Sequence, residues 1–408
     1  MRVYIFIAAI AGVVTWLMTP VIRQLAFRIG AVGEVRARDV HTVPTPRIGG
    51  VAMLAGILVS FIFASRTPWV DNLFIESQQL WVVLGGAILI CLVGVADDLW
   101  DLDWMLKMSG QLIISLLVSW GGVQIVSLPL GNLFSVSTSW SIAISAFLLV
   151  ASINAVNFVD GLDGLASGIV AIGGIAFAVY SYMLARSTAN FASVAIIIDV
   201  VIVGVCVGFL LHNWHPASIF MGDSGSMLLG YMVTCASIVM TGRLDPNAHH
   251  VNVYLPAFIP ILLPILVLFL PVLDMILAIV RRVSKGLSPM HPDRMHLHHR
   301  MLRIGHSVRT AVAILWAWAA LISFSSVLLL FFRMRYVFSG FLIAAAILTV
   351  ITLFPYYRTR FVQIRQEKQE RAQSLAQDRH NDQANLQQDD HTVTADHPAT
   401  AAKEKHEH

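Results

Sequence analysis

Charged residues are scarce in this chain of 408 residues, because Asp, Glu, Lys and Arg together make up 12% of it while hydrophobic residues make up 57%. Soluble domains carry about a quarter charged residues, so this composition excludes an ordinary soluble domain. Cysteine is also rare: only Cys91, Cys206 and Cys235 occur, all within apolar runs. They show no metal spacing and no disulfide framework, and we expect them to be packing residues.

Apolar runs of about 17 to 25 residues, the length of a membrane-spanning helix, recur along the chain. We identify about eleven, at 3–19, 48–65, 80–96, 111–126, 140–156, 168–185, 194–211, 226–241, 254–280, 311–332 and 336–355. The ninth contains four prolines, which predict a kinked or broken helix. The sequence therefore predicts an all-α, polytopic integral membrane domain over residues 1–355.

The tail, residues 356–408, has a different composition, rich in Gln, Asp, Glu, Lys, His and Ala from about Phe361 on. It has almost no aromatic residues, so it cannot bury a core, and we expect it to be solvated and largely disordered. Its scattered histidines lack the spacing of metal ligands.

Basic residues indicate which side of the membrane each loop occupies. The odd-numbered loops between predicted helices hold 13 Lys and Arg, whereas the N-terminus and the even-numbered loops hold six. Because cytoplasmic loops are enriched in Lys and Arg, the odd loops are expected in the cytoplasm. With an odd number of helices, the N-terminus is then outside and the tail inside.

Every dense polar cluster lies on one of these odd loops, hence on one face of the membrane. The sequence GVADDLWDLDWMLK contains the pair Asp97–Asp98 where the third helix ends. Two neighbouring carboxylates can bind a hard cation, or one can bind it while the other takes a proton. Asp101 and Asp103 are more typical of loop or cap residues. Lys107 is expected either to meet a phosphate or to be an interfacial lysine whose stem lies in the bilayer.

A second cluster, NAVNFVDGLDGLASG, begins at Asn154. Its polar residues Asn154, Asn157, Asp160 and Asp163 recur every three positions, so they would line one face if the chain stayed helical to the turn. The alternative is two DG turns followed by a helix start. We favour a polar stripe facing a ligand-holding cleft at the cytoplasmic rim.

A third cluster, FMGDSGS, places Asp223 between two glycines just before the next helix. Small residues before a helix leave free N–H groups that suit phosphate, and Asp223 can bind a cation that the phosphate shares. Phe220 offers an aromatic face for a base or sugar, although a core aromatic is the simpler interpretation.

The fourth cluster, PDRMHLHHR, contains His296, His298, His299 and Arg300. Zinc is one interpretation, but no carboxylate or cysteine has ligand spacing, and zinc hydrolase motifs place two histidines four apart on a helix. A basic clamp for a diphosphate is favoured over both zinc and a solvated loop.

These motifs in this order resemble the polyprenyl-phosphate N-acetylhexosamine-1-phosphate transferase family (glycosyltransferase family 4). The resemblance covers roughly residues 1–355 and rests on DD, N-x-x-N-x-x-D-G-L-D-G-L, F-M-G-D-x-G-S and P-D-R-x-H-L-H-H-R. TPRIGG and HLHHR are similar to the WecA-type branch, which uses UDP-GlcNAc. The resemblance implies ten or eleven transmembrane helices with a cytoplasmic active-site cleft.

The resemblance also implies the reaction, in which polyprenyl phosphate (undecaprenyl or decaprenyl) and UDP-GlcNAc give polyprenyl-diphosphate-GlcNAc and UMP. It implies Mg²⁺ or Mn²⁺, a bacterial cell membrane and a first step of envelope polysaccharide synthesis. The lipid bilayer and the two substrates are the expected partners; nucleic acid is not, and a homodimer is left open.

The chemistry of this reaction and the resemblance together predict a role for each residue. Asp223 would be the principal metal ligand with Asp98 near the metal, and Asp97 would bind or deprotonate the lipid phosphate. The residues expected to contact the nucleotide, sugar or diphosphate are Asn154, Asn157, Asp160, Asp163, Phe220, Lys107, His296, His298, His299 and Arg300, of which Asp160 and Asp163 are also catalytic candidates. Covalent catalysis, with Asp97 or Asp160 attacking first, is the alternative to direct attack by the lipid phosphate.

Three other functions compete with this one. The family branch that transfers a phospho-N-acetylmuramoyl-pentapeptide has a different histidine loop and ranks second. A CDP-alcohol phosphotransferase would need an arginine where Ser167 stands. A secondary transporter usually has related halves and polar sites at the bilayer midplane, whereas the acids here gather at one rim.

Overall fold

The computed structural model describes most of the predicted membrane domain. The described residues are 2–32, 44–125, 127–130, 132–135, 137–187, 193–241, 269–284, 286, 301–302, 304–354 and 369. The chain divides into two units, Met1–Thr352 and Leu353–His408. Nearly all of the second unit lies outside the described residues, so the expected solvated tail stays a prediction.

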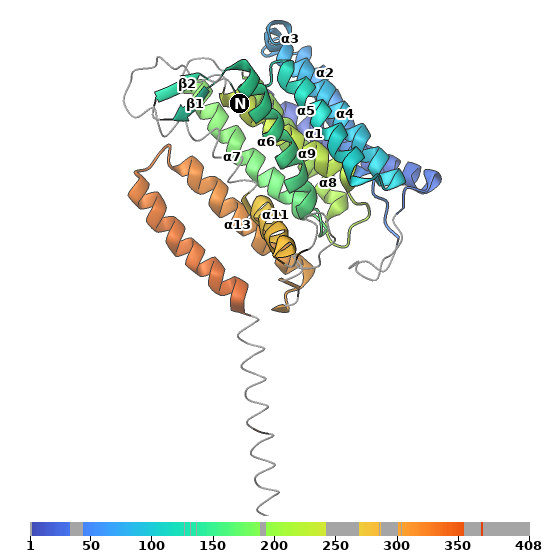
Figure 1. Ribbon diagram of the computed structural model, residues 1–408, viewed down its shortest axis with the longest axis vertical. Coiled ribbons are helices and arrows are strands. Elements are labelled where there is room, and N and C mark those ends of the chain that lie inside the picture. Colours follow the sequence, from blue (N-terminus) through green and yellow to red (C-terminus); the bar gives the residue numbers. More distant parts are fainter. Residues whose placement is uncertain are drawn as a thin grey trace, which may run out of the picture. The chain divides into compact units, whose positions relative to one another are not determined.

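Helices make up almost all of the described part of the first unit (Figure 1). They are α1 (Arg2–Ile29), α2 (Gly49–Ser65), α3 (Asp71–Glu76), α4 (Gln78–Trp100), α5 (Trp104–Trp120), α6 (Thr138–Val159), α7 (Leu165–Ser187), α8 (Val194–Asn213), α9 (Gly222–Thr241), α11 (Phe269–Val283), α13 (Val308–Leu328) and a further helix, Met334–Phe354. One antiparallel hairpin, β1 (Ser127–Leu130) and β2 (Asn132–Ser135), lies between α5 and α6.

Eight of the described helices are long and apolar enough to cross a membrane, and α2 is a shorter apolar helix of 17 residues. Ten of the eleven predicted runs overlap described helices, although α5 also has only 17 residues and ends six residues before the predicted run does. Of the ninth run, only the part within α11 is described. The prediction of an all-α polytopic membrane protein is confirmed, with the small hairpin as an exception in a connecting loop.

Helix α9 lies at the centre of the bundle and packs against α2, α4, α6 and α8 (Figure 1). It is the most buried of the candidate spans, whereas Met334–Phe354 is the least buried. Small residues allow this central position: Gly94 of α4 lies against the backbone of Ser224, and Gly230 lies against Ile153 of α6. Because lipid is as apolar as leucine, such close backbone approach is a main source of helix association in membranes.

Some buried polar side chains inside the bundle form hydrogen bonds between helices. Asp199 of α8 is buried and accepts a hydrogen bond from the Ser181 hydroxyl of α7 at 3.2 Å. Tyr231 of α9 donates to the Val83 carbonyl of α4 at 3.0 Å. The three cysteines are free and buried, which confirms the prediction that they are packing residues.

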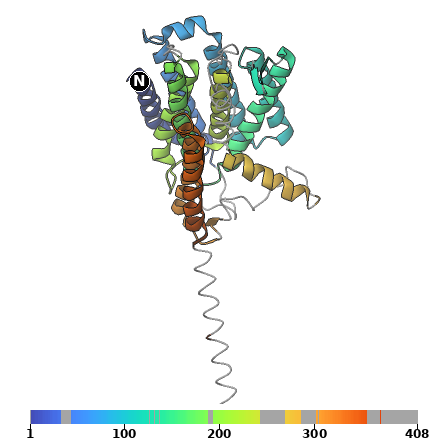
Figure 2. The same cartoon turned by 90° about the vertical axis from the view of Figure 1, so that its left-hand side faces the viewer.

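Helix α11 lies across the direction of the other long helices (Figure 2). It contacts α6 and ends with a buried arginine, Arg282, whose guanidinium lies over the Phe158 ring at 5.9 Å. Phe158 is in the last turn of α6. The basic end of α11 is therefore beside the end of α6 from which the DGLDG turn starts.

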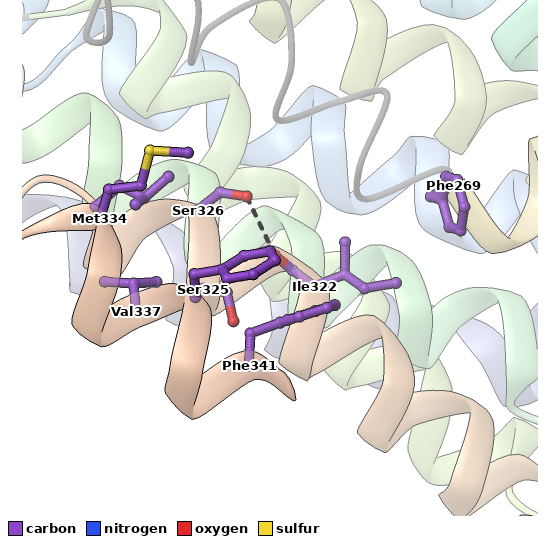
Figure 3. Close-up of a pocket in the computed structure, with 9 residues that line it drawn as sticks. Phe269, Ile322, Ser325, Ser326, Met334, Val337 and Phe341 are labelled. Atoms are coloured by element: carbon purple, nitrogen blue, oxygen red, sulfur yellow. Dashed lines mark hydrogen bonds between the residues drawn. The ribbon is translucent and has the colours of Figure 1, made fainter. Parts of the chain in front are cut away.

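An apolar cavity of about 270 Å³ lies between α13 and the start of helix Met334–Phe354 (Figure 3). Ile322, Met334, Val337 and Phe341 line it together with Phe269 of α11, and the Ser326 hydroxyl is hydrogen-bonded to the Ile322 carbonyl. Among the described residues, no acidic side chain lines this cavity. It is therefore separate from the carboxylate cluster that the sequence identifies.

Candidate functional site

Helix α4 carries the pair Asp97–Asp98 in its last turn and delivers it to one end of the bundle. The chain leaves α4 through Asp101, which adopts the left-handed conformation at φ 50°. Asp103 then caps α5, since its carboxylate accepts a hydrogen bond from the Met105 N–H at 2.9 Å. The expectation that Asp103 is a cap residue is confirmed.

Lys107, in the first turn of α5, points back towards the end of α4. Its Nζ lies 3.0 Å from Asp97 Oδ2, and it also forms an ion pair with Asp223 Oδ2 at the start of α9. One ammonium group thus joins carboxylates from two other helices. Lys107 belongs to the carboxylate cluster and is not merely an interfacial lysine.

Asp98 holds the N-terminus of α9. Its two carboxylate oxygens accept hydrogen bonds from the backbone N–H groups of Asp223 at 2.8 Å and of Ser224 at 3.0 Å. The first N–H groups of a helix lack partners within the helix, and a side-chain oxygen that accepts from them stabilises the helix start. Asp98 therefore fixes the position of Asp223 from 125 residues away.

Glycine is required at position 222, where the ends of α4 and α9 meet residues 46–50. Its φ is +67°, and a Cβ there would lie 2.5 and 2.6 Å from the two Asp98 oxygens and would overlap the Arg47 carbonyl oxygen. A left-handed conformation with backbone and carboxylate this close accommodates only glycine without strain. The glycine before Asp223 thus lets α4, α9 and residues 46–50 meet.

Phe220 is positioned by pairing of its backbone with the TPRIGG stretch. Its N–H donates to the Pro46 carbonyl at 2.8 Å, and its carbonyl accepts from the Gly49 N–H at 3.0 Å. The side chain of Phe220 is only partly buried. This exposure is compatible with an aromatic face for a ligand at the mouth of the site.

The polar stripe expected along residues 154–163 is only partly correct. Helix α6 ends at Val159, and the chain then turns through Gly164, whose φ is +72°. Only the two asparagines are therefore helical. The Asn154 amide donates to Gln111 Oε1 of α5 at 2.6 Å, which ties α6 to α5. Asn157 differs, because its buried Nδ2 has no hydrogen-bond acceptor within the described part of the chain.

Asp163 is buried and holds the loop that leads to Phe220. Its Oδ2 lies 2.6 Å from His215 Nδ1 and accepts a hydrogen bond from the Ala217 N–H at 3.0 Å. Arg309 of α13 donates to the His215 carbonyl at 3.0 Å. The geometry gives Asp163 a positioning role, beside the expected catalytic or substrate-binding one.

Asp160 caps the end of α6 and lies between the other carboxylates. Burial, together with the smaller effect of the nearby Asp98 and Asp163 charges, raises the pKa of Asp160 to about 8. A carboxyl group with this pKa is mostly protonated at neutral pH. It can therefore donate a hydrogen bond to a phosphate or sugar oxygen.

The structure therefore brings together Asp97, Asp98, Lys107, Asp160 and Asp223 from the ends of four helices. The expected basic clamp of His296, His298, His299 and Arg300 lies outside the described residues. Asp101 is exposed beyond the cluster.

Comparisons with known proteins agree with the motifs. Residues 80–241 match the glycosyl transferase family 4 profile. The chain is 40% identical, over 85% of its own length and 88% of the relative's, to a decaprenyl-phosphate N-acetylglucosaminephosphotransferase of Mycobacterium tuberculosis. The chain belongs to glycosyl transferase family 4. A probable undecaprenyl-phosphate N-acetylglucosaminyl 1-phosphate transferase of Bacillus subtilis is 31% identical over 80% of this chain and 85% of its own length.

A less similar relative also aligns with most of the chain. The undecaprenyl-phosphate alpha-N-acetylglucosaminyl 1-phosphate transferase of Escherichia coli is 27% identical over 75% of this chain and 78% of its own length. The matched profile spans α4 to α9. It therefore includes every residue of the carboxylate cluster.

The donor atoms of the cluster suit a divalent cation such as Mg²⁺. Asp97 and Asp223 are carboxylates that already share one cationic group, the Lys107 ammonium. Within the described residues, no three His, Cys, Asp or Glu side chains converge as a complete metal site. Mg²⁺ usually binds one or two carboxylates and takes its other ligands from phosphates and water, so the residues present fit such an ion.

Two residues that shape this site are not identified by the sequence motifs alone. They are His215, which contacts Asp163, and Gly222, which precedes α9. The partner of His215 is 52 positions away, and no periodicity relates the two. The glycine at position 222 is visible in the sequence, but the atoms that surround it come from α4 and residue 47. Local sequence alone therefore does not show that glycine is required there.

Proposed function

We propose that this chain transfers GlcNAc-1-phosphate from UDP-GlcNAc to a polyprenyl phosphate, giving polyprenyl-diphosphate-GlcNAc and UMP. The observation that carries the proposal is the Asp97–Lys107–Asp223 cluster at the N-terminus of the central helix, in a chain related to proteins named for this reaction. Two anionic substrates must meet here, so charge neutralisation and alignment are the main requirements.

Asp223 is the proposed principal ligand of Mg²⁺ or Mn²⁺, with Asp98 close by. The ion would neutralise the diphosphate and stabilise the departing UMP. Asp98 contributes by holding the N–H groups of Asp223 and Ser224, which sets where the Asp223 carboxylate points. A carboxylate whose backbone is anchored loses little freedom on binding a ligand, which favours tight positioning.

Asp97 and Lys107 are proposed to receive the lipid phosphate. A phosphate group has a second pKa of about 6 and is mostly dianionic at neutral pH, so it needs little help from a base. Direct attack is favoured over a covalent route: Asp97 is ion-paired with Lys107, and Asp160 is mostly protonated at neutral pH and so rarely presents an attacking carboxylate. The attacking atom is then a lipid phosphate oxygen, and the sugar-bearing phosphorus accepts it.

The donor is proposed to lie over the loop formed by residues 219–222. Phe220 would stack on the uracil ring. The Asn157 amide, which has no acceptor within the described residues, and the protonated Asp160 would donate hydrogen bonds to oxygens of the UDP-sugar. The basic segment His296, His298, His299 and Arg300 would clamp the diphosphate.

The protein is a multi-pass membrane protein, and we place the cluster and the tail in the cytoplasm with the N-terminus outside. The bias of Lys and Arg towards the loops that carry the cluster supports this orientation. UDP-sugars are soluble and charged, so the donor must reach the cluster from the aqueous side that contains it.

UMP release from the purified full chain in detergent tests the proposal. With polyprenyl phosphate and Mg²⁺, UDP-GlcNAc should give UMP, EDTA should abolish it, and UDP-MurNAc-pentapeptide should give none. Release from the pentapeptide donor alone would keep the chemistry and overturn the proposed substrate. No UMP from either donor, in folded protein, would favour a transporter.

The same assay in sealed vesicles tests the orientation. Inverted vesicles, whose cytoplasmic face is outward, should use external UDP-GlcNAc without permeabilisation. Right-side-out vesicles should require permeabilisation, and the opposite pattern would overturn the orientation.

A further inference from the structure

The Lys107 ammonium is ion-paired with Asp223, the carboxylate that the proposed function assigns to the metal. It reaches from α5 to Asp97 Oδ2 of α4 and to Asp223 Oδ2 of α9. The contact is sheltered from water, with 18% of the lysine side chain and 26% of the Asp223 side chain exposed. Shelter of this kind strengthens an ion pair relative to one on an open surface.

Two cations weaken each other's binding to this one carboxylate, because like charges a few ångströms apart repel each other in a partly buried site. We propose that Lys107 and the divalent cation compete for Asp223, so that the substrate-free protein binds the metal weakly. The inference rests on the proposed function, which makes Asp223 the metal ligand. It assigns Lys107 a role in the substrate-free state that precedes any contact with phosphate.

An order of binding follows from this competition. A diphosphate brings negative charge that attracts the ammonium away from Asp223 and supplies further oxygen ligands to the metal. The metal is therefore expected to enter with the donor as a metal–diphosphate complex, while Lys107 stays paired with Asp97 and turns to phosphate oxygens. Until the donor arrives, the lysine keeps the carboxylates of α4 and α9 from repelling each other.

The inference is tested by measuring the affinity of Mn²⁺ for the full-length protein in detergent, without UDP-sugar. Electron paramagnetic resonance reports the free and bound Mn²⁺. Lys107→Met keeps the apolar stem and removes the charge, and it should tighten Mn²⁺ binding by about tenfold or more. Lys107→Gln should also bind Mn²⁺ more tightly than the wild type. It replaces the methionine variant in the experiment if that variant folds poorly. The double variant Lys107→Met/Asp223→Asn should lose the gain, which places the effect at Asp223.

Arg23→Met is the matched control for a general loss of positive charge. Arg23 is exposed near the end of α1, where its guanidinium lies over Phe27, outside the cluster. Its removal should leave Mn²⁺ affinity unchanged within about twofold, as expected of a screened surface charge. Unchanged or weaker Mn²⁺ binding by the folded Lys107 variants would overturn the inference, because a merely structural lysine predicts that result.

The outcome is separable from that of the proposed function, because the titration needs no UDP-sugar and no lipid. Tighter Mn²⁺ binding without UMP release in the wild type would support the competition and overturn the reaction. UMP release in the wild type with unchanged Mn²⁺ affinity in the variants would support the reaction and overturn the competition.

Discussion

Asp223→Asn should lower UMP release from UDP-GlcNAc by about a hundredfold to a thousandfold, the range expected when a group that stabilises transition-state charge is removed. The substitution keeps the size of the side chain and its backbone N–H, so the hydrogen bond to Asp98 stays intact. The loss should therefore fall on kcat, with the melting temperature in detergent little changed. Initial rates at saturating donor and lipid measure it.

Asp103→Asn is the matched control for this prediction. Asp103 belongs to the same acidic loop as Asp97 and Asp98, but its carboxylate only caps α5. Asparagine caps helices about as well as aspartate, so activity should stay within about twofold of the wild type. Equal losses in both variants would contradict a specific role for Asp223.

Gly222→Ala should lower the rate of UMP release by about a hundredfold, because a displacement of about 1 Å at a reacting group can cost that much. The added Cβ would meet the Asp98 carboxylate and the Arg47 carbonyl in a left-handed backbone conformation. The start of α9 would then shift, and Asp223 with it. Kinetics in detergent, with thermal unfolding measured in parallel, check the prediction.

Gly85→Ala is the corresponding control, because Gly85 lies in the membrane helix α4 and a Cβ there meets no atom within 4 Å. Alanine is favoured over glycine within helices, so this variant should be as stable and as active as the wild type. If Gly222→Ala were about as active as Gly85→Ala, the proposed close packing of Gly222 against Asp98 would be contradicted.

The membrane helices could be predicted from the sequence because each apolar run carries its own evidence for a helix. A run of this length must satisfy its backbone hydrogen bonds internally, whatever its neighbours are. Because Asp97, Asp160 and Asp223 all lie on odd-numbered loops between predicted helices, the sequence also predicts that they share one end of the bundle. The structure brings these three residues together as that argument requires.

The tertiary roles of the same residues could not be predicted, because they depend on partners far along the chain. Asp98 caps a helix that starts 125 residues later, and Asp163 binds a loop 52 residues away. The stripe from Asn154 to Asp163 failed as a single face because α6 ends at Val159. Local spacing identified these residues as candidates for the site, but tertiary packing determines the hydrogen-bond partners of each one.

Transfer of a phosphorus label tests the proposed reaction most directly. With UDP-GlcNAc carrying ³²P in its β-phosphate, the full chain and polyprenyl phosphate should give labelled lipid and unlabelled UMP. This result requires that the bond between the two phosphates of the donor breaks. Label that stays in UDP while unlabelled sugar reaches the lipid would show transfer of the sugar alone and would contradict the account.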